Sequence, residues 1–170
     1  MKLAIIIFFL ILFTSRIGIS SEQIIVRHLA MYDYIEKALP CQQIFEYIKL
    51  YSEKYNIPER LMFKVAKLET NYDGPNDFYY IPNQISSVNA YGPMQILLST
   101  ANDINTRIER IVYRKITRED LLYDIELNIH LSAIYLRNLY NSYGSWKIAC
   151  GYYNSGFPIT NQYAIVATSW

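Results

Sequence analysis

The chain has 170 residues, of which 52% are hydrophobic and 18% are charged, and its formal net charge is +1. This length and composition suit one globular domain with its own hydrophobic core. Lys and Arg are scattered rather than clustered, so the sequence offers no basic surface and argues against binding of a nucleic acid.

Residues 1–20 predict an export signal peptide. Lys2 supplies the positive end, residues 3–13 form an apolar run, and Gly18 and Ser20 are small residues suited to a cleavage site. The run is short for a bilayer span, although an uncleaved anchor is the alternative. No Cys follows the run at the cleavage point, which argues against a lipoprotein. In either case we expect the protein to be exported, to the periplasm or the extracellular space.

Two helices are predicted in residues 21–55. Apolar residues recur at helical spacing through 23–39 and again through 42–55. The first helix should stop at Pro40, because proline interrupts a helix. We expect both helices to pack on the domain formed by residues 56–170.

The next helix, predicted from about Asn56 to Asn71, carries a carboxylate on its apolar face. At 100° per residue, Glu69 lies about 20° from Met62 and about 40° from Val65 around the helix axis. Burial there would penalise the charged form and raise the pKa of Glu69, which keeps a carboxylic acid protonated and able to donate its proton. The alternative is a frayed helix end, with Glu69 in solvent.

The rest of the chain predicts further helices joined by turns. Residues 73–91 are rich in Asn, Pro, Ser and Tyr without a sustained period, which indicates a long and functional loop. Helices are then expected over 94–106, from Thr117 with Asp120 in a capping box, over 126–142 closing at Gly144, from Ser145 to Asn154, and for a turn or two over 160–166. The fold class is therefore mainly α, without repeats.

Cysteine and histidine give no catalytic or metal site. Cys41 and Cys150 are compatible with one disulfide bond or with two separate buried thiols, and the sequence leaves both readings open. Neither cysteine has neighbours that would make it a nucleophile. His28 and His130 are isolated on helical stretches, where a structural role is the common one. We expect no metal and no cofactor.

Four short motifs follow one another at sensible spacing, and their order is more specific than any one of them. They are Glu69-Thr70, then Ser86 followed by Gly92-Pro93-Met94-Gln95-Ile96, then Asn128-Ile129 with Tyr135-Leu136, and finally Tyr152-Tyr153-Asn154-Ser155-Gly156. Over residues 56–166 the chain resembles the soluble, goose-lysozyme-like lytic transglycosylases. The resemblance implies a single lysozyme-like helical domain with a substrate groove.

The resemblance also implies a reaction and its acid. Glu69 would protonate the oxygen between N-acetylmuramic acid and N-acetylglucosamine in peptidoglycan, then accept the proton of the muramic 6-hydroxyl, so that the product is a 1,6-anhydro sugar. Because no water is consumed, a second carboxylate is not needed; Asp73 and Asp77 are the nearest acids. Two alternatives are a goose-type lysozyme, which hydrolyses the same bond, and a non-catalytic exported protein that binds glycan.

Further site residues are carried over from the resemblance. Tyr153 would be catalytic, with its hydroxyl beside the acid and orienting it. The expected substrate-binding residues are Thr70, Ser86, Gly92, Met94, Gln95, Tyr152 and Asn154. The chain departs from the family pattern at Thr70 for Ser, Pro93 for Leu, Asn89 for Gly and Tyr152 for Ala, and its loop between Glu69 and Gln95 is longer.

Partners and location follow from the same resemblance. We expect a monomer that acts on peptidoglycan glycan strands at the cell wall. Compact exported members of the family often open the wall locally for a secretion apparatus or for a phage, which implies a partner of one of these kinds.

Overall fold

The computed structural model describes residues 21–169, which divide into one compact unit up to Ala38 and a second from Leu39 onward. The described part of the first unit is helix α2 (Ser21–Lys37), in which Lys37 pairs with Asp33 at 2.8 Å. The expected export signal lies outside the described residues. Within residues 21–169, no helix has the length and apolar character needed to cross a bilayer.

The second unit is mainly helical, as the sequence predicts. Its elements are α3 (Pro40–Lys54), α4 (Glu59–Thr70), β1 (Ala90–Tyr91), β2 (Ile96–Leu97), α5 (Leu98–Asp103), the π-helix η2 (Ile104–Ile108), α6 (Arg118–Tyr123), α7 (Ile125–Tyr143), α8 (Trp146–Ser155) and α9 (Gln162–Ala167). The two strands form a small antiparallel hairpin, with Tyr91 opposite Ile96.

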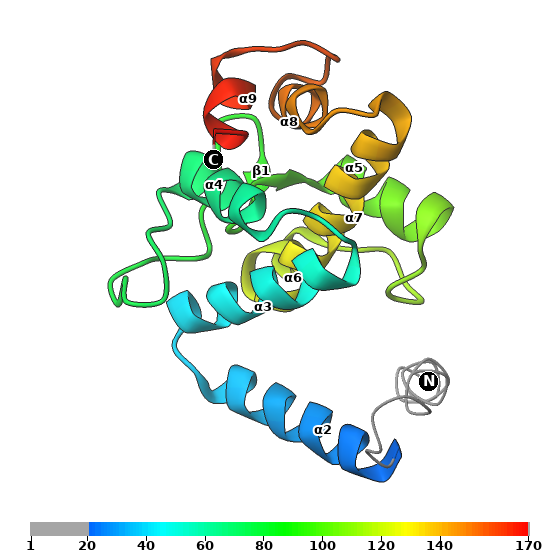
Figure 1. Ribbon diagram of the computed structural model, residues 1–170. Helices are drawn as coiled ribbons and strands as arrows, with labels where there is room; N and C mark the ends of the chain where they lie inside the picture. The colour runs from blue at the N-terminus through cyan, green and yellow to red at the C-terminus, as the bar shows by residue number, and fades with distance from the viewer. Residues whose placement is uncertain (1–20, 170) are drawn as a thin grey trace. The chain divides into compact units, whose positions relative to one another are not determined.

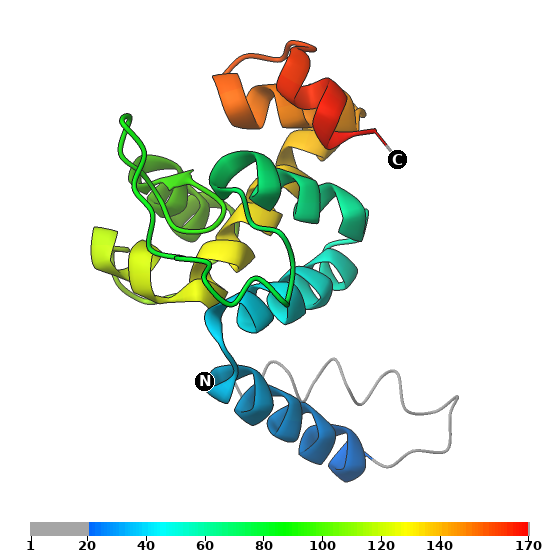
Figure 2. The ribbon, with the colours of Figure 1, turned by 90° about the vertical axis from the view of Figure 1, so that its left-hand side faces the viewer.

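Helix α7 is the centre of this unit. Figures 1 and 2 show it running through the middle, and it contacts α3, α6, α8 and η2. Residues 127–134 are all buried, although Asn128, His130 and Ser132 among them are polar. Eight consecutive residues face every side of a helix, so the first half of α7 is covered all round by its neighbours.

Several helix ends form as the sequence predicts. Thr117 caps α6, accepting from the backbone N–H of Asp120, whose carboxylate accepts from the Thr117 N–H at 2.8 Å. Gly144 ends α7 in the left-handed region at φ 66°, and the Ser145 hydroxyl caps α8. The Thr117 and Ser145 caps satisfy N–H groups that the helices leave unpaired, and the Gly144 N–H donates to the Tyr140 oxygen at the end of α7.

Two expected boundaries were wrong. The helix expected over 94–106 begins only at Leu98, because Gly92 to Gln95 form a turn in which Gln95 has φ 49°, and β2 follows it. The helix expected over 42–55 begins earlier, at Pro40, where proline costs nothing because that N–H has no partner within the helix. The first helix does stop before Pro40, as expected, since α2 ends at Lys37.

Of the two alternatives for the cysteines, the structure shows two separate thiols and not a disulfide bond. Cys41 and Cys150 are both buried and free. The Cys41 thiol donates to the backbone oxygen of Pro75 at 3.3 Å, and burial raises the pKa of Cys150 to about 12. A thiol with such a pKa stays protonated and unreactive at neutral pH.

Candidate active site

Glu69 lies in the last turn of α4, next to the core. Leu61, Met62 and Val65 of the same helix are fully buried, which fixes the face that α4 turns inward. Glu69 itself is half-buried. The helix ends directly after it, since Asn71 adopts the left-handed conformation at φ 60°. The acid therefore stands at a helix end with part of its surface open to a ligand.

Burial shifts the acidity of Glu69 in the direction that its sequence position predicts. Removal from water raises its pKa above the ordinary carboxyl value, because the charged form loses more hydration than the neutral one. A hydrogen bond from Tyr163 acts in the opposite direction and is the smaller influence. Glu69 therefore stays protonated, and able to donate its proton, to a higher pH than a free glutamic acid does.

The hydroxyl that meets the acid comes from the last helix of the chain. Tyr163, on α9, donates to Oε1 of Glu69 at 2.6 Å. Helix α9 packs against both α4 and α8, and Figure 2 shows it beside α8 at the end of the unit. Burial and the nearby Glu69 charge raise the pKa of Tyr163 well above its ordinary value, so this donor stays neutral.

A close helix contact holds α9 in place. A Cβ on Gly151 of α8 would come within 1.7 Å of the Ile159 backbone oxygen and 3.7 Å from Cβ of Ala164. Only glycine lets the segment before α9 lie this close to α8. Asn161 then caps α9 by accepting from the Ala164 N–H at 2.9 Å.

Tyr153 does not make the bond expected of it. Its hydroxyl donates to the backbone oxygen of Met94 at 2.7 Å, and its ring lies 5.4 Å from that of Tyr135. In this structure Tyr163 donates to the acid instead, and a catalytic role for Tyr153 stays a prediction. The Glu69 charge still contributes to raising the pKa of Tyr153, so the tyrosine lies within electrostatic reach of the acid.

Gly92 and Met94 both pack against Asn128 of α7. A Cβ on Gly92 would lie 2.3 Å from Nδ2 of Asn128 and 2.5 Å from the Leu121 backbone oxygen. The Met94 side chain is fully buried, and its N–H donates to Oδ1 of Asn128 at 3.1 Å. Both residues are buried, and their contact with a glycan stays a prediction.

The Thr70 side chain is also directed into the interior of the protein. It is buried, and its hydroxyl lies 3.0 Å from the Ala66 oxygen, 2.9 Å from the Pro93 oxygen and 2.6 Å from the Tyr80 hydroxyl. These partners occupy the hydrogen-bonding capacity of the hydroxyl, and binding of substrate by Thr70 stays a prediction. Thr70 instead joins the end of α4 to the turn before Met94 and to the loop over residues 73–89.

Ser86 and Gln95 shape that loop and its exit. The Ser86 hydroxyl accepts from the Ala90 N–H at 3.0 Å, so it caps a turn. The Gln95 side-chain nitrogen donates to the Gly92 oxygen at 2.8 Å and to the Gln84 oxygen at 3.2 Å. Gln95 is half-buried, and its amide oxygen has no protein donor among the described residues.

Tyr152 and Asn154 lie on the surface of α8. Tyr152 stacks on Tyr143 with ring centroids 5.7 Å apart. Asn154 is exposed and accepts from Nδ2 of Asn161, the residue that caps α9, at 3.1 Å. Asn154 thereby supports the helix that carries Tyr163, and contact of either side chain with a glycan stays a prediction.

Within residues 21–169, no other acid contributes to the raised pKa of Glu69, and no metal cluster occurs. Burial and Tyr163 account for the shift of the Glu69 pKa, without a contribution from another acid. Asp73 is largely exposed and paired with Lys67. The described residues contain no group of His, Cys, Asp and Glu that could hold a metal ion.

Tyr163 is the residue that sequence reasoning missed. The sequence predicts a short helix there but marks none of its residues, and 17 tyrosines give no way to single one out. The one local signal is Asn161, whose position before a short apolar run is typical of a helix cap. It places the helix without saying what the helix packs against.

Comparison with known proteins agrees with this geometry. Residues 46–165 match the family described as Transglycosylase SLT domain. No curated protein sequence matches the chain. The matched segment contains every residue of the site described above.

Solved structures of larger proteins share the fold. The 70-kDa soluble lytic transglycosylase of Escherichia coli aligns with 27% identity and a TM-score of 0.55 over 65% of this chain and 16% of its own. A complex of the 70-kDa soluble lytic transglycosylase with bulgecin A aligns with 24% identity and a TM-score of 0.56, over 72% of this chain and 18% of its own. An inactive Glu-to-Gln mutant of the Pseudomonas aeruginosa lytic transglycosylase Slt aligns with 18% identity and a TM-score of 0.53, over 65% of this chain and 16% of its own. The chain thus spans about a sixth of these proteins.

Proposed function

Because this chain belongs to the Transglycosylase SLT domain family, we propose that it is a lytic transglycosylase that cleaves the β-1,4 bond between N-acetylmuramic acid and N-acetylglucosamine in peptidoglycan. The observation that carries the proposal is the environment of Glu69. This acid is half-buried, its pKa is raised, and its partner is a neutral hydroxyl.

In the first step Glu69 acts as general acid. It donates its proton to the glycosidic oxygen as the bond to the muramic carbon breaks, and the leaving sugar departs as an alcohol. Tyr163 holds Oε1, which leaves Oε2 to carry and deliver the proton. A cationic partner at the same place would lower the pKa of Glu69 and weaken it as an acid.

In the second step the same carboxylate acts as general base. It accepts the proton of the muramic 6-hydroxyl while that oxygen bonds to the reacting carbon, which returns Glu69 to its acid form. The nucleophile belongs to the substrate and is already close to the carbon, so it has a high effective concentration. The product ends in 1,6-anhydro-N-acetylmuramic acid, and no water enters.

The competing proposal is hydrolysis of the same bond, as in a goose-type lysozyme. A hydrolase of the inverting kind needs a second carboxylate to activate water. In the described structure Asp73 is paired with Lys67 on the surface, and no acid contributes to the Glu69 shift. These observations favour the transglycosylase.

Mass analysis of the products tests the proposal. Purified peptidoglycan treated with the protein should release muropeptides that end in anhydromuramic acid, each lighter by one water than a lysozyme product, with no new reducing ends. Asp73→Asn and Asp77→Asn should leave the rate unchanged. Products that end mainly in reducing sugars, with release lost in either Asp variant, would establish the hydrolase instead.

Location and partners belong to the same proposal. A peptidoglycan substrate requires export, and the features of residues 1–20 support it. We propose a monomer at the periplasmic or extracellular cell wall that opens the wall locally for a secretion apparatus or a phage. Protease protection in intact cells tests the location.

A further inference from the structure

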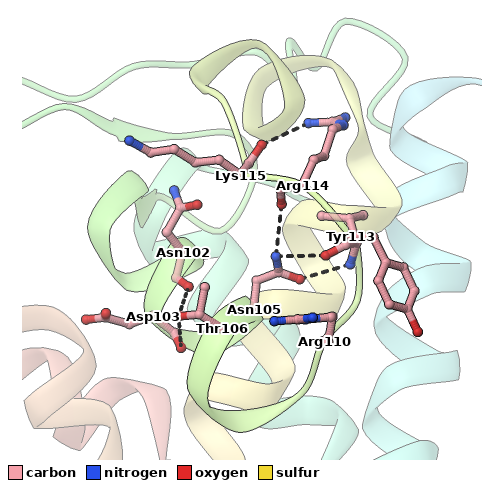
Figure 3. A pocket seen from close by; sticks show the side chains of 9 residues that line it. Asn102, Asp103, Asn105, Thr106, Arg110, Tyr113, Arg114 and Lys115 are labelled. Atoms are coloured by element: carbon pink, nitrogen blue, oxygen red, sulfur yellow. Dashed lines mark hydrogen bonds between the residues drawn. The ribbon is translucent and has the colours of Figure 1, made fainter.

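A pocket of about 420 Å³ is lined by none of the residues assigned to the candidate active site. Figure 3 shows it between α5, η2 and the segment that follows them. Its lining consists of Asn102, Asp103, Asn105, Thr106, Arg110, Val112, Tyr113, Arg114 and Lys115. A space of this size can hold a few amino-acid residues of a ligand.

The pocket has a fixed frame. Asn105 is buried, and its side chain makes four hydrogen bonds to the backbone of residues 111–114 at 2.9 to 3.2 Å. Asn102 binds the backbone N–H and oxygen of Ile116 in the same way, at 2.9 and 3.1 Å. The segment over residues 109–116 is therefore tied down at both ends, and its exposed side chains start from a defined position.

The charge of the lining is unbalanced. Asp103 pairs with Arg107 at 3.7 Å, and the Arg114 guanidinium makes a two-pronged contact with Asp120 at 2.5 and 2.7 Å. Across residues 21–169, Arg110 and Lys115 have no carboxylate partner, and the Arg110 guanidinium instead lies 5.8 Å from the centre of the Tyr113 ring. Two positive charges thus remain available at the pocket.

The helix beside the pocket has an uncommon form. Residues Ile104–Ile108 make a π-helix, in which Glu109 donates its N–H to the Ile104 oxygen at 3.1 Å. Single π-turns cost hydrogen-bond geometry and are found frequently at functional sites. This irregularity points to the same pocket independently of its charge.

We propose that this pocket binds the peptide stems of peptidoglycan through their carboxylates. The inference rests on the proposed function, since it takes the wall polymer as substrate. Arg110 and Lys115 would hold stem carboxylates by charge-assisted hydrogen bonds. Tyr113, which is 71% exposed, offers a flat face for the peptide chain. The protein would thereby bind the peptide stems of the wall polymer in addition to its glycan strands.

Phosphate groups of other wall polymers share this oxyanion chemistry, so the test must separate the two sources. We would measure co-sedimentation of the full chain with three materials: peptidoglycan freed of phosphate polymers, peptide-free glycan strands, and wall that retains its phosphate polymers. All proteins carry Glu69→Gln, so that binding is measured without cleavage. The charge variant is Arg110→Gln with Lys115→Gln. The matched control is Arg60→Gln with Lys147→Gln, two exposed cations on α4 and α8 that do not line the pocket.

The charge variant should bind peptide-bearing, phosphate-free wall about 3- to 10-fold more weakly than the Glu69→Gln protein without further changes, as expected for two exposed charge contacts. Raised salt should reduce this difference, because salt screens such contacts. Binding to peptide-free strands should not distinguish the variant from the control.

Three results would overturn the proposal: no loss in the charge variant, an equal loss in the control, or a loss that requires the phosphate polymers. Equal thermal midpoints of the two double variants verify that both fold. Failure of the proposed function is visible separately, as the absence of cleavage by the protein that retains Glu69, whereas the binding assay does not depend on cleavage.

Discussion

The hydroxyl of Tyr163 donates to Oε1 of Glu69 at 2.6 Å, although the two residues lie 94 positions apart in the chain. The bond joins the last helix to the final turn of α4. It fixes one oxygen of the acid with a neutral group, so burial remains the dominant influence on the Glu69 pKa and that pKa stays raised. Orientation and acidity are thus set by different parts of the fold.

The first prediction concerns the acid. Glu69→Gln should reduce glycan cleavage by about a thousandfold or more, because an amide of nearly the same shape cannot donate the proton. Release of soluble muropeptides measures the effect, and a cooperative thermal unfolding transition shows that the fold is kept. Activity that survives in the folded variant would remove Glu69 from the mechanism.

The second prediction concerns Tyr163. Loss of its hydroxyl in Tyr163→Phe should lower kcat by about 10- to 100-fold through poorer orientation of the acid. The same change should raise the pKa of Glu69 further, because the lost hydrogen bond is the one that lowers it. The high-pH limb of the rate profile should therefore move to higher pH. A reduced rate with an unmoved profile would indicate a packing role alone.

Tyr153→Phe is a separate prediction with a different signature. Its hydroxyl donates to the Met94 oxygen, beside the turn that leads into β2. Removal should leave that buried oxygen unsatisfied and reduce the free energy of unfolding by about 1 to 3 kcal/mol, while the Glu69 pKa changes little. Chemical denaturation with a parallel pH profile measures both quantities. A displaced profile in this variant would place its hydroxyl on the acid.

The fourth prediction links Glu69 to stability. Its pKa is raised in the folded protein, so the folded state holds the proton more tightly than the unfolded state. The associated stability is fully present below the ordinary carboxyl pKa, and it is lost as the pH rises through the raised value. The free energy of unfolding should therefore fall with rising pH relative to Glu69→Gln, which does not titrate. A difference between the two proteins that is independent of pH would contradict the burial of this acid.

The fifth prediction compares two glycines with the same backbone conformation. Gly92 and Gly144 have φ of 74° and 66°, but a Cβ on Gly92 meets Asn128 and Leu121, whereas a Cβ on Gly144 meets nothing within 4 Å. Gly144→Ala should cost only the left-handed strain of about 1 to 2 kcal/mol. Gly92→Ala adds a clash and should cost at least about 3 kcal/mol. Equal losses in urea denaturation would show that packing against Asn128 is unimportant.

Local sequence signals predicted the parts of the structure that local forces determine. The position of Glu69 beside Met62 and Val65 on one helix face follows from helical periodicity alone. The capping box at Thr117 and the left-handed glycine at Gly144 depend on neighbouring residues, and both form as expected. The motifs that resemble the lytic transglycosylases lie within the segment that matches the family.

Motif resemblance was a poorer guide to what each side chain touches. Thr70, Gly92 and Met94 belong to motifs that suggested contact with sugar, yet each is buried against other parts of the chain. A motif records that a residue type is required, and the requirement is the same whether it comes from a ligand or from packing. Burial, which is a property of the whole fold, separates the two.

The sequence by itself determined the helices, the acid and its tendency toward a raised pKa, because these depend on residues within a few turns of one another. Only the tertiary structure decided which hydroxyl holds the acid, since Tyr163 reaches Glu69 through the packing of α9 on α4 and α8. It likewise decided that Cys41 and Cys150 stay apart and that, within the described part of the chain, Arg110 and Lys115 lie beside the π-helix without a carboxylate partner. The physical reason is that packing selects partners by shape across the chain, and spacing along the sequence does not encode that selection.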